Sequence, residues 1–106
     1  MRRLSGANVK PRNRKMAPVR NIVGPQIRKL REERGLTQPM LAARCNLLGW
    51  GLSRETLAKI ETQVRWVADA ELLCFSYALK VPLDAFLPKT KTRDRMQDFF
   101  RGLGKT

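Results

Sequence analysis

Apolar side chains recur every three or four residues through the middle of the chain, and polar clusters with glycine or proline interrupt them. This spacing is typical of helices that bury one face, and no stretch shows the alternation of a strand. The pattern therefore predicts an all-α domain. Its five helices are expected at residues 25–34, 38–48, 54–63, 70–79 and 83–87.

The predicted helix ends carry matching signals. Pro25 suits a first helical turn, and Gly35 can end the first helix in a left-handed conformation. Thr37, Ser53 and Asp69 precede the next three helices, where a side-chain oxygen can cap free backbone N–H groups. We therefore expect short helices with defined ends.

Apolar residues at helical spacing are expected to face a common core. They are Ile27 and Leu30 in the first helix, Leu41, Cys45 and Leu48 in the second, Leu57 and Ile60 in the third, and Leu72, Leu73, Phe75 or Ser76, and Leu79 in the fourth. Nothing in the sequence points to export, so Cys45 and Cys74 are expected as small core residues, with a disulfide as the alternative.

Charge divides the 106 residues, whose net charge is +13, into three segments. Residues 1–23 carry seven Lys/Arg and no acid, residues 24–88 carry nine against seven, and residues 89–106 carry six against two. We therefore expect a disordered basic arm at 1–23, a compact domain at 24–88 and a basic tail at 89–106. Basic ends of this kind favour nucleic acid as the partner, before a membrane.

The tail contains an apolar stripe that fits a short amphipathic helix at 93–103. Its members, at i, i+3, i+4 and i+7, are Met96, Phe99, Phe100 and Leu103. Such a helix is too short to be stable alone, so its stripe needs a surface. Three arrangements are open: packing on its own domain, packing on a second subunit in a homodimer, or a frayed tail.

Several function classes lack their usual residues. The chain has no histidine, no Cys-x-x-Cys pair, no glycine-rich phosphate loop and no nucleophile elbow, so we expect neither an enzyme nor a metal, cofactor or small-molecule site. It also has no apolar run of about 18 residues and no signal-peptide pattern. We therefore expect a cytoplasmic, nucleoid-associated protein without a membrane span.

The order of motifs in the central domain resembles the helix-turn-helix domain of the phage-repressor/Cro type (XRE family). The matching stretches are Leu30-Arg31-Glu32-Glu33-Arg34-Gly35-Leu36-Thr37-Gln38, Leu41-Ala42, Leu52-Ser53-Arg54, Leu57-Ala58-Lys59-Ile60-Glu61 and the closing segment 78–87. The resemblance covers about 65 residues and implies a compact five-helix fold. It also implies that helix 54–63 docks in the major groove of DNA.

Carried over position by position, the resemblance implies a set of contacts. Arg54, Glu55 and Lys59 would contact bases, since Arg and Lys can donate to guanine and Glu can accept from cytosine. The DNA backbone would be contacted by Thr37, Gln38, Ser53, Thr56, Arg65 and Trp66. For Trp66, a position as a lid on the core is an equal alternative. The resemblance also implies a structural ion pair between Arg31 and Glu61 that ties the first helix to the third.

The chain departs from the family pattern in the turn before Ser53. Residues 46–51 replace about one residue of the usual pattern, so the turn is larger by about five residues. Trp50 is expected either to fill this turn or to stand exposed as a contact to DNA or protein. The insertion leaves the tilt of the third helix open.

These observations predict sequence-specific binding of double-stranded DNA, and hence a transcriptional regulator. Two alternatives are a protein-interaction module, similar to an antitoxin or a co-activator, and a basic protein that binds nucleic acid without sequence preference.

Overall fold

The computed structural model describes residues 19–88 and Phe100. This part of the chain forms four α-helices and one 3₁₀-helix, and it contains no strand. The elements are α1 (Gly24–Glu33), α2 (Gln38–Leu47), α3 (Arg54–Glu61), α4 (Asp69–Leu79) and η3 (Leu83–Phe86). The all-α expectation is confirmed, with the fifth segment a single 3₁₀ turn.

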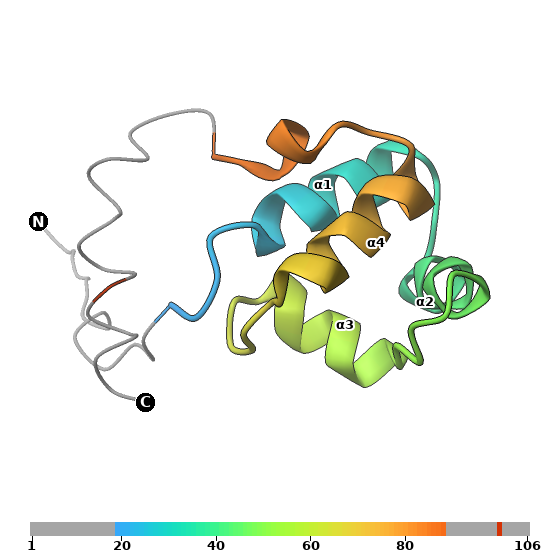
Figure 1. The fold of residues 1–106 in the computed structure, drawn as a ribbon, viewed down its shortest axis with the longest axis horizontal. Helices are drawn as coiled ribbons and strands as arrows, with labels where there is room; N and C mark the ends of the chain where they lie inside the picture. The colour runs from blue at the N-terminus through green and yellow to red at the C-terminus, as the bar shows by residue number, and fades with distance from the viewer. Residues whose placement is uncertain (1–18, 89–99, 101–106) are drawn as a thin grey trace, which may run out of the picture.

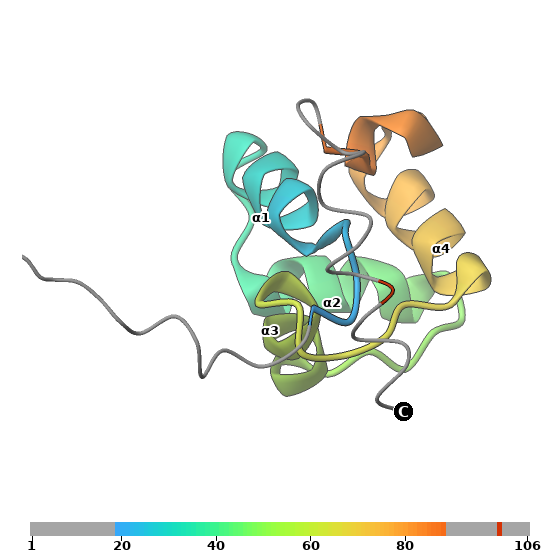
Figure 2. The same cartoon turned by 90° about the vertical axis from the view of Figure 1, so that its left-hand side faces the viewer.

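The four α-helices and η3 pack around a common core (Figure 1). α1 and α4 pack against each other and carry η3, while α3 packs against α1 and α2. α2 also contacts α4 and closes the core. As a result, η3 and α3 lie at opposite ends of the domain, as both views show (Figures 1 and 2).

The core consists of one cluster contributed by every helix. Its largest fully buried side chains are Ile27, Leu41, Cys45, Leu57, Ile60, Phe75, Leu79 and Phe86. Each predicted inner face of α1, α2 and α3 supplies members of this cluster, because apolar residues on one helical stripe leave water together.

All four α-helices end in the same way, with a residue of positive φ followed by a backbone hydrogen bond to the last turn. The residues are Gly35 (φ 68°), Gly49 (φ 103°), Gln63 (φ 68°) and Lys80 (φ 58°). In each case the next N–H donates to the carbonyl five residues before it, and these bonds are Leu36 to Arg31, Trp50 to Cys45, Val64 to Lys59 and Val81 to Ser76. This arrangement is the Schellman motif, which satisfies carbonyls that the helix leaves free. The left-handed stop expected at Gly35 is confirmed.

The enlarged turn at 46–51 is built on the second of these motifs. After Gly49 the chain reverses, and the Trp50 ring meets Phe75 edge to face with 5.2 Å between ring centroids. The Asn46 side chain donates to the Leu52 carbonyl at 2.9 Å and so holds the far side of the turn. The expectation that Trp50 fills the turn is confirmed. The core position predicted for Leu48 is wrong: this residue is 51% exposed, because the helix ends before it and Trp50 covers the core instead.

Two predictions for the fourth helix need correction. Ala68, not Asp69, is the cap residue, and its N–H donates to the Glu71 carboxylate at 3.0 Å while Asp69 is already helical. Leu73 is 42% exposed, since the buried face of α4 is formed by residues 75, 76, 78 and 79. The helix is apolar nearly all round, so periodicity alone did not distinguish its inner face.

The segment directly before α1 packs against the helices. Residues 19–23, assigned from sequence to the arm, pack on the domain, and Asn21 and Val23 are buried. The third helix ends at Glu61 rather than at residue 63. Residues 1–18 and the proposed helix 93–103 lie outside the described residues, apart from Phe100, which is helical and exposed.

Gly24→Ala is expected to destabilise the domain. A Cβ at this position would overlap the Ile60 carbonyl oxygen and lie 3.0 Å from that of Glu61, both backbone atoms that cannot turn away. Overpacking of this kind costs about 1–3 kcal/mol or more, which outweighs the gain in helix propensity. Urea unfolding followed by circular dichroism measures the change.

The matched control is Gly51→Ala, because a Cβ there meets no atom within 4 Å. It is expected to leave the free energy of unfolding unchanged or to raise it slightly. Equal stabilities for the two variants would contradict the close approach of α1 to the end of α3.

Candidate nucleic-acid interface

Hydroxyl caps set the start of α2 and of α3. The Thr37 Oγ1 accepts from the Met40 N–H at 3.2 Å, and the Ser53 Oγ accepts from the Thr56 N–H at 3.1 Å. The two hydroxyls of Ser53 and Thr56 also lie 3.0 Å apart in a hydrogen bond. Because these caps satisfy N–H groups at the helix starts, they fix where the exposed faces of α2 and α3 begin.

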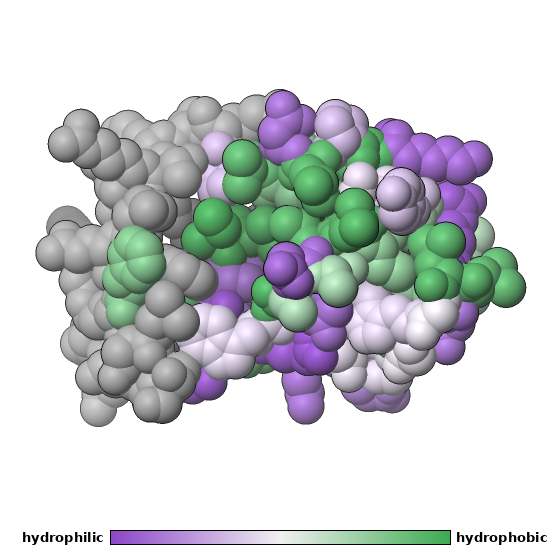
Figure 3. All heavy atoms as spheres, viewed as in Figure 1, coloured by the Kyte–Doolittle hydropathy of each residue, from purple (hydrophilic) through white to green (hydrophobic). Residues whose placement is uncertain are grey.

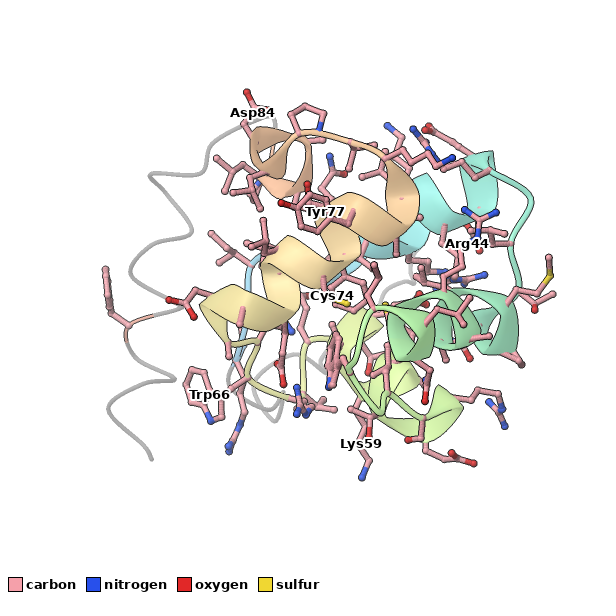
Figure 4. All side chains as sticks on the ribbon, turned by 45° about the vertical axis from the view of Figure 1, so that its right-hand side comes forward. Arg44, Lys59, Trp66, Cys74, Tyr77 and Asp84 are labelled. Atoms are coloured by element: carbon pink, nitrogen blue, oxygen red, sulfur yellow. The ribbon has the colours of Figure 1, made fainter. Side chains whose placement is uncertain are left out.

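α3 divides into a buried and an exposed face. Leu57 and Ile60 are fully buried against α1 and α2, whereas Arg54, Glu55 and Lys59 are exposed. Lys59 points away from the rest of the domain in Figure 4. The structure thus places the three expected base-contact residues on one exposed helix surface, with two cations and one acid available for hydrogen bonds.

A buried ion pair fixes the inner side of this helix. The Arg31 Nε donates to Glu61 Oε2 at 2.7 Å, and its Nη2 donates to Oε1 at 3.2 Å. A third donor, Nη1, reaches the Leu36 carbonyl at 2.7 Å. The side chains of Arg31 and Glu61 are 10% and 2% exposed, and their hydrogen bonds raise the pKa of Arg31. The pair implied by the family resemblance is present, and it joins α1 to the last turn of α3.

Gln38 extends this pair to the surface. Its Nε2 donates to Glu61 Oε1 at 3.0 Å, and its Oε1 accepts from Arg54 Nη1 at 3.5 Å. The second contact is long and therefore weak. Together they form a polar chain from the buried pair to the first residue of α3, so the start of α2 and the exposed end of α3 are held together.

Arg65 is paired within the chain. Its guanidinium binds both carboxylate oxygens of Glu71, at 2.8 and 3.2 Å. Desolvation raises the pKa of Glu71. The hydrogen bonds from Arg65 and from the Ala68 N–H, together with the charge of Arg65, lower the pKa by more than desolvation raises it, so the pKa lies below its ordinary value. Arg65 thus orders the loop between α3 and α4. Because Glu71 already neutralises part of the Arg65 charge, a phosphate at this place would be attracted less strongly.

Trp66 lies in the same loop and is half-buried. The Arg20 guanidinium sits over its ring, 5.7 Å from the centroid, which is within the range of a cation–π contact. Figure 4 shows Trp66 at the edge of the domain. Trp66 is therefore in contact with the segment that precedes α1.

The two cysteines are reduced and adjacent. Cys45 is buried and Cys74 partly buried, with the Cys74 Sγ 3.8 Å from the Cys45 carbonyl oxygen. Desolvation, followed by the nearby Cys74, raises the pKa of Cys45 to about 12. A thiol of this kind is inert, so the expectation of small core residues is confirmed for Cys45 and holds in part for Cys74, whose side chain reaches the surface.

No group of three histidine, cysteine or acidic side chains that could hold a metal ion occurs among residues 19–88 and Phe100. The same part of the chain has no helix with the length and apolarity needed to cross a membrane.

Sequence reasoning missed Asn21 and Gln63. Both are buried or half-buried and connect the segment before α1 to the end of α3. An asparagine can accept from the backbone N–H two residues on, as Asn21 does from Val23, and this Asx-turn tendency is the local signal that could have found it. Nothing local marks Gln63, because its partner lies 42 residues away in the sequence.

Comparison with known proteins agrees with this geometry. A family model described as helix-turn-helix matches residues 27–86. The crystal structure of the hypothetical transcription factor NHTF from Neisseria is similar, with 22% identity, a TM-score of 0.56, and coverage of 90% of this chain and 98% of that chain. At this identity the likeness concerns the fold. No curated protein matches the sequence.

Removing one partner of the buried ion pair is expected to be costly. Arg31→Met leaves the Glu61 carboxylate buried without a cation, which typically costs about 3–5 kcal/mol. The double variant Arg31→Met/Glu61→Leu should recover much of this loss, because no buried charge remains. Denaturant unfolding of the single variants and the double variant measures the coupling.

The exposed Arg28–Glu32 pair is the matched control, with side chains 60% and 54% exposed. Arg28→Ala is expected to cost only about 0.5 kcal/mol or less. A similar small cost for Arg31→Met would contradict the structural importance of the buried pair.

The Arg65–Glu71 contact should produce a pH-dependent stability. Since the folded pKa of Glu71 is lowered from 4.5, its contribution is fully present above that pH and is lost as the pH falls through the folded pKa. The native protein should exceed Glu71→Gln in stability at neutral pH, and the difference should vanish in acid. Urea midpoints of both proteins over a pH series check this, and a difference independent of pH would contradict it.

Proposed function

The chain belongs to the helix-turn-helix family of the XRE type, and on this premise we propose that it is a transcriptional regulator that binds a specific sequence of double-stranded DNA. The observation that carries the proposal is the exposed surface of α3, held from behind by the Arg31–Glu61 pair. No catalytic step, cofactor or small-molecule ligand is needed for this function. A cytoplasmic, nucleoid-associated location would follow from it.

In this proposal α3 enters the major groove and its exposed side chains contact base edges. Arg54 and Lys59 would donate to guanine, and Glu55 would accept from cytosine. Arg54 stands at the first turn of α3, where family members place base contacts.

The remaining predicted residues would contact the DNA backbone. Gln38 lies beside Arg54 at the start of α2, and its side chain and backbone N–H would contact a phosphate. Ser53 and Thr37 would use the hydroxyls that cap α3 and α2, and Thr56 would use the hydroxyl that is hydrogen-bonded to Ser53. In the loop after α3, Trp66 and Arg65 would contact the neighbouring phosphates, with Arg65 contributing less than an unpaired arginine because of Glu71.

A second function, binding to a protein, is favoured by one observation. Apolar side chains gather on the face formed by α4 and η3 (Figure 3). The exposed members are Leu73, Tyr77, Leu83 and Leu87. Exposed apolar patches often mark protein contacts. A homodimer through residues 93–103 remains a proposal, since that segment lies outside the described part of the chain.

Selection of bound sites from random duplexes tests the proposed function. The native protein should prefer the selected duplex over a scrambled one at about 0.15 M salt, as expected for a base-reading helix. Arg54→Ala/Lys59→Ala should abolish most of this preference, because each good base contact contributes about 1–3 kcal/mol. Fluorescence anisotropy titrations measure both affinities.

The control variant is Arg28→Ala/Lys29→Ala, which removes the same charge from the exposed side of α1. It should weaken binding to both duplexes slightly and leave the preference intact. Equal binding of selected and scrambled duplexes by the native protein would contradict the proposal and favour non-specific binding of nucleic acid.

A further inference from the structure

The segment before α1 is bonded to the chain that follows α3. The Arg20 N–H donates to the Gln63 carbonyl at 3.0 Å, and the Gln63 side chain donates to the Asn21 carbonyl at 3.0 Å. The buried Asn21 side chain donates to the Ile60 carbonyl at 3.0 Å and to the Arg65 carbonyl at 2.9 Å. These bonds fix the backbone of residues 20 and 21 beside the end of α3.

The Arg20 side chain lies on Trp66, in the loop after α3. Its guanidinium carbon is over the ring face, 5.7 Å from the ring centroid. A guanidinium stacked on a ring uses its flat face, whereas its N–H donors point outward along its edge. The edge of the Arg20 guanidinium can therefore donate two parallel hydrogen bonds to an anion with paired oxygens, such as a phosphate.

Arg20 differs in this respect from two other arginines that the fold holds in place. Arg31 directs two of its donors at the Glu61 carboxylate. Arg65 donates to both carboxylate oxygens of Glu71. Arg20 forms no salt bridge with any acid in the described part of the chain. Its positive charge is therefore available to an anionic ligand.

This guanidinium lies near the end of α3 that carries Lys59. Lys59 is exposed in the last turn of α3, and its carbonyl accepts from the Val64 N–H in the loop that leads to Trp66. Figure 4 shows Lys59 and Trp66 on the side of the domain opposite Asp84. The eight residues of α3 span about 12 Å, similar to the width of the major groove. A duplex that holds α3 therefore brings backbone phosphates close to the helix end.

We propose that Arg20 binds a backbone phosphate of the duplex whose bases α3 contacts, with the Trp66 ring as its support. The inference rests on the proposed function of α3. Arg20 lies outside residues 27–86, which match the helix-turn-helix family model, so this contact is an addition to that motif. A phosphate carries no sequence information, so Arg20 contributes to affinity and to salt dependence rather than to the choice of bases.

The variant Arg20→Gln tests the inference, because it removes the charge and leaves the backbone bonds of residue 20 in place. Binding to the selected and the scrambled duplex is titrated between about 50 and 200 mM salt. The slope of log affinity against log salt should become shallower by about 0.9, the value of one phosphate contact. The loss of affinity should therefore be about 3-fold larger at the lowest salt than at the highest. Both duplexes should be affected alike.

Two further variants separate a phosphate contact from a structural role. Lys29→Gln removes the same charge from the exposed side of α1 and should change the slope much less. Arg20→Lys keeps the charge without the planar fork, so it should keep the native slope at a lower affinity. A structural role of Arg20 on Trp66 would instead give the same loss of affinity at every salt concentration. Circular dichroism checks that each variant is folded.

Trp66→Leu tests the support. This change should lower the affinity of the native protein and have little further effect when it is combined with Arg20→Gln, because the ring acts through the arginine. Additive losses would overturn this part of the inference.

An unchanged salt slope for Arg20→Gln would overturn the phosphate contact, as would an equal slope change for Lys29→Gln. The proposed function fails on a different result, which is equal binding of selected and scrambled duplexes by the native protein. The inference fails when that preference is present and Arg20 has no effect on the slope.

Discussion

The buried pair of Arg31 and Glu61 is the interaction on which the arrangement of the helices depends. Removing two charges from water is expensive. The cost is tolerated here because the two side chains bind each other and also make hydrogen bonds to neighbouring groups. Arg31 uses three of its donors, on Glu61 and on the Leu36 carbonyl, and Glu61 also accepts from Gln38. The pair therefore connects α1, the turn after it, the start of α2 and the end of α3. An apolar contact in the same place would permit sliding, whereas these directional bonds define one angle for α3.

The helix ends also determine the path of the chain between the helices. The same backbone motif ends all four α-helices, but the residue at positive φ differs. Glycine suits this conformation in the first two, whereas Gln63 adopts it together with side-chain and backbone bonds to residues 20 and 21. In the enlarged turn, Gly49 allows the reversal that places Trp50 over Phe75. The five extra residues are thus absorbed beside α4 and the core, and the Ser53 cap at the start of α3 is kept.

Positive charge is concentrated at the two ends of the chain, a distribution that suits an extended polyanion. The central domain is nearly balanced, and part of its positive charge is neutralised internally, as in Arg31 and Arg65. The exposed face of α3 carries two cations, Arg54 and Lys59. The larger excess of cations lies in the two ends of the chain, and the contacts of Asn21 and Gln63 give the N-terminal end a defined starting point beside α3.

The sequence by itself determined the order of the helical elements and most of their starts and ends. Helical periodicity, the caps at Thr37 and Ser53 and the stop at Gly35 are local properties, because each depends on residues within a turn or two of one another. The family resemblance added the Arg31–Glu61 pair and the exposed set on α3. Only the tertiary structure decided the roles of Trp50, Leu48 and Leu73, since which side of a nearly apolar helix is buried depends on its neighbours in space. The attachment of Asn21 to α3 was also decided there, because its partners lie about forty residues away and their carbonyls carry no sequence signal.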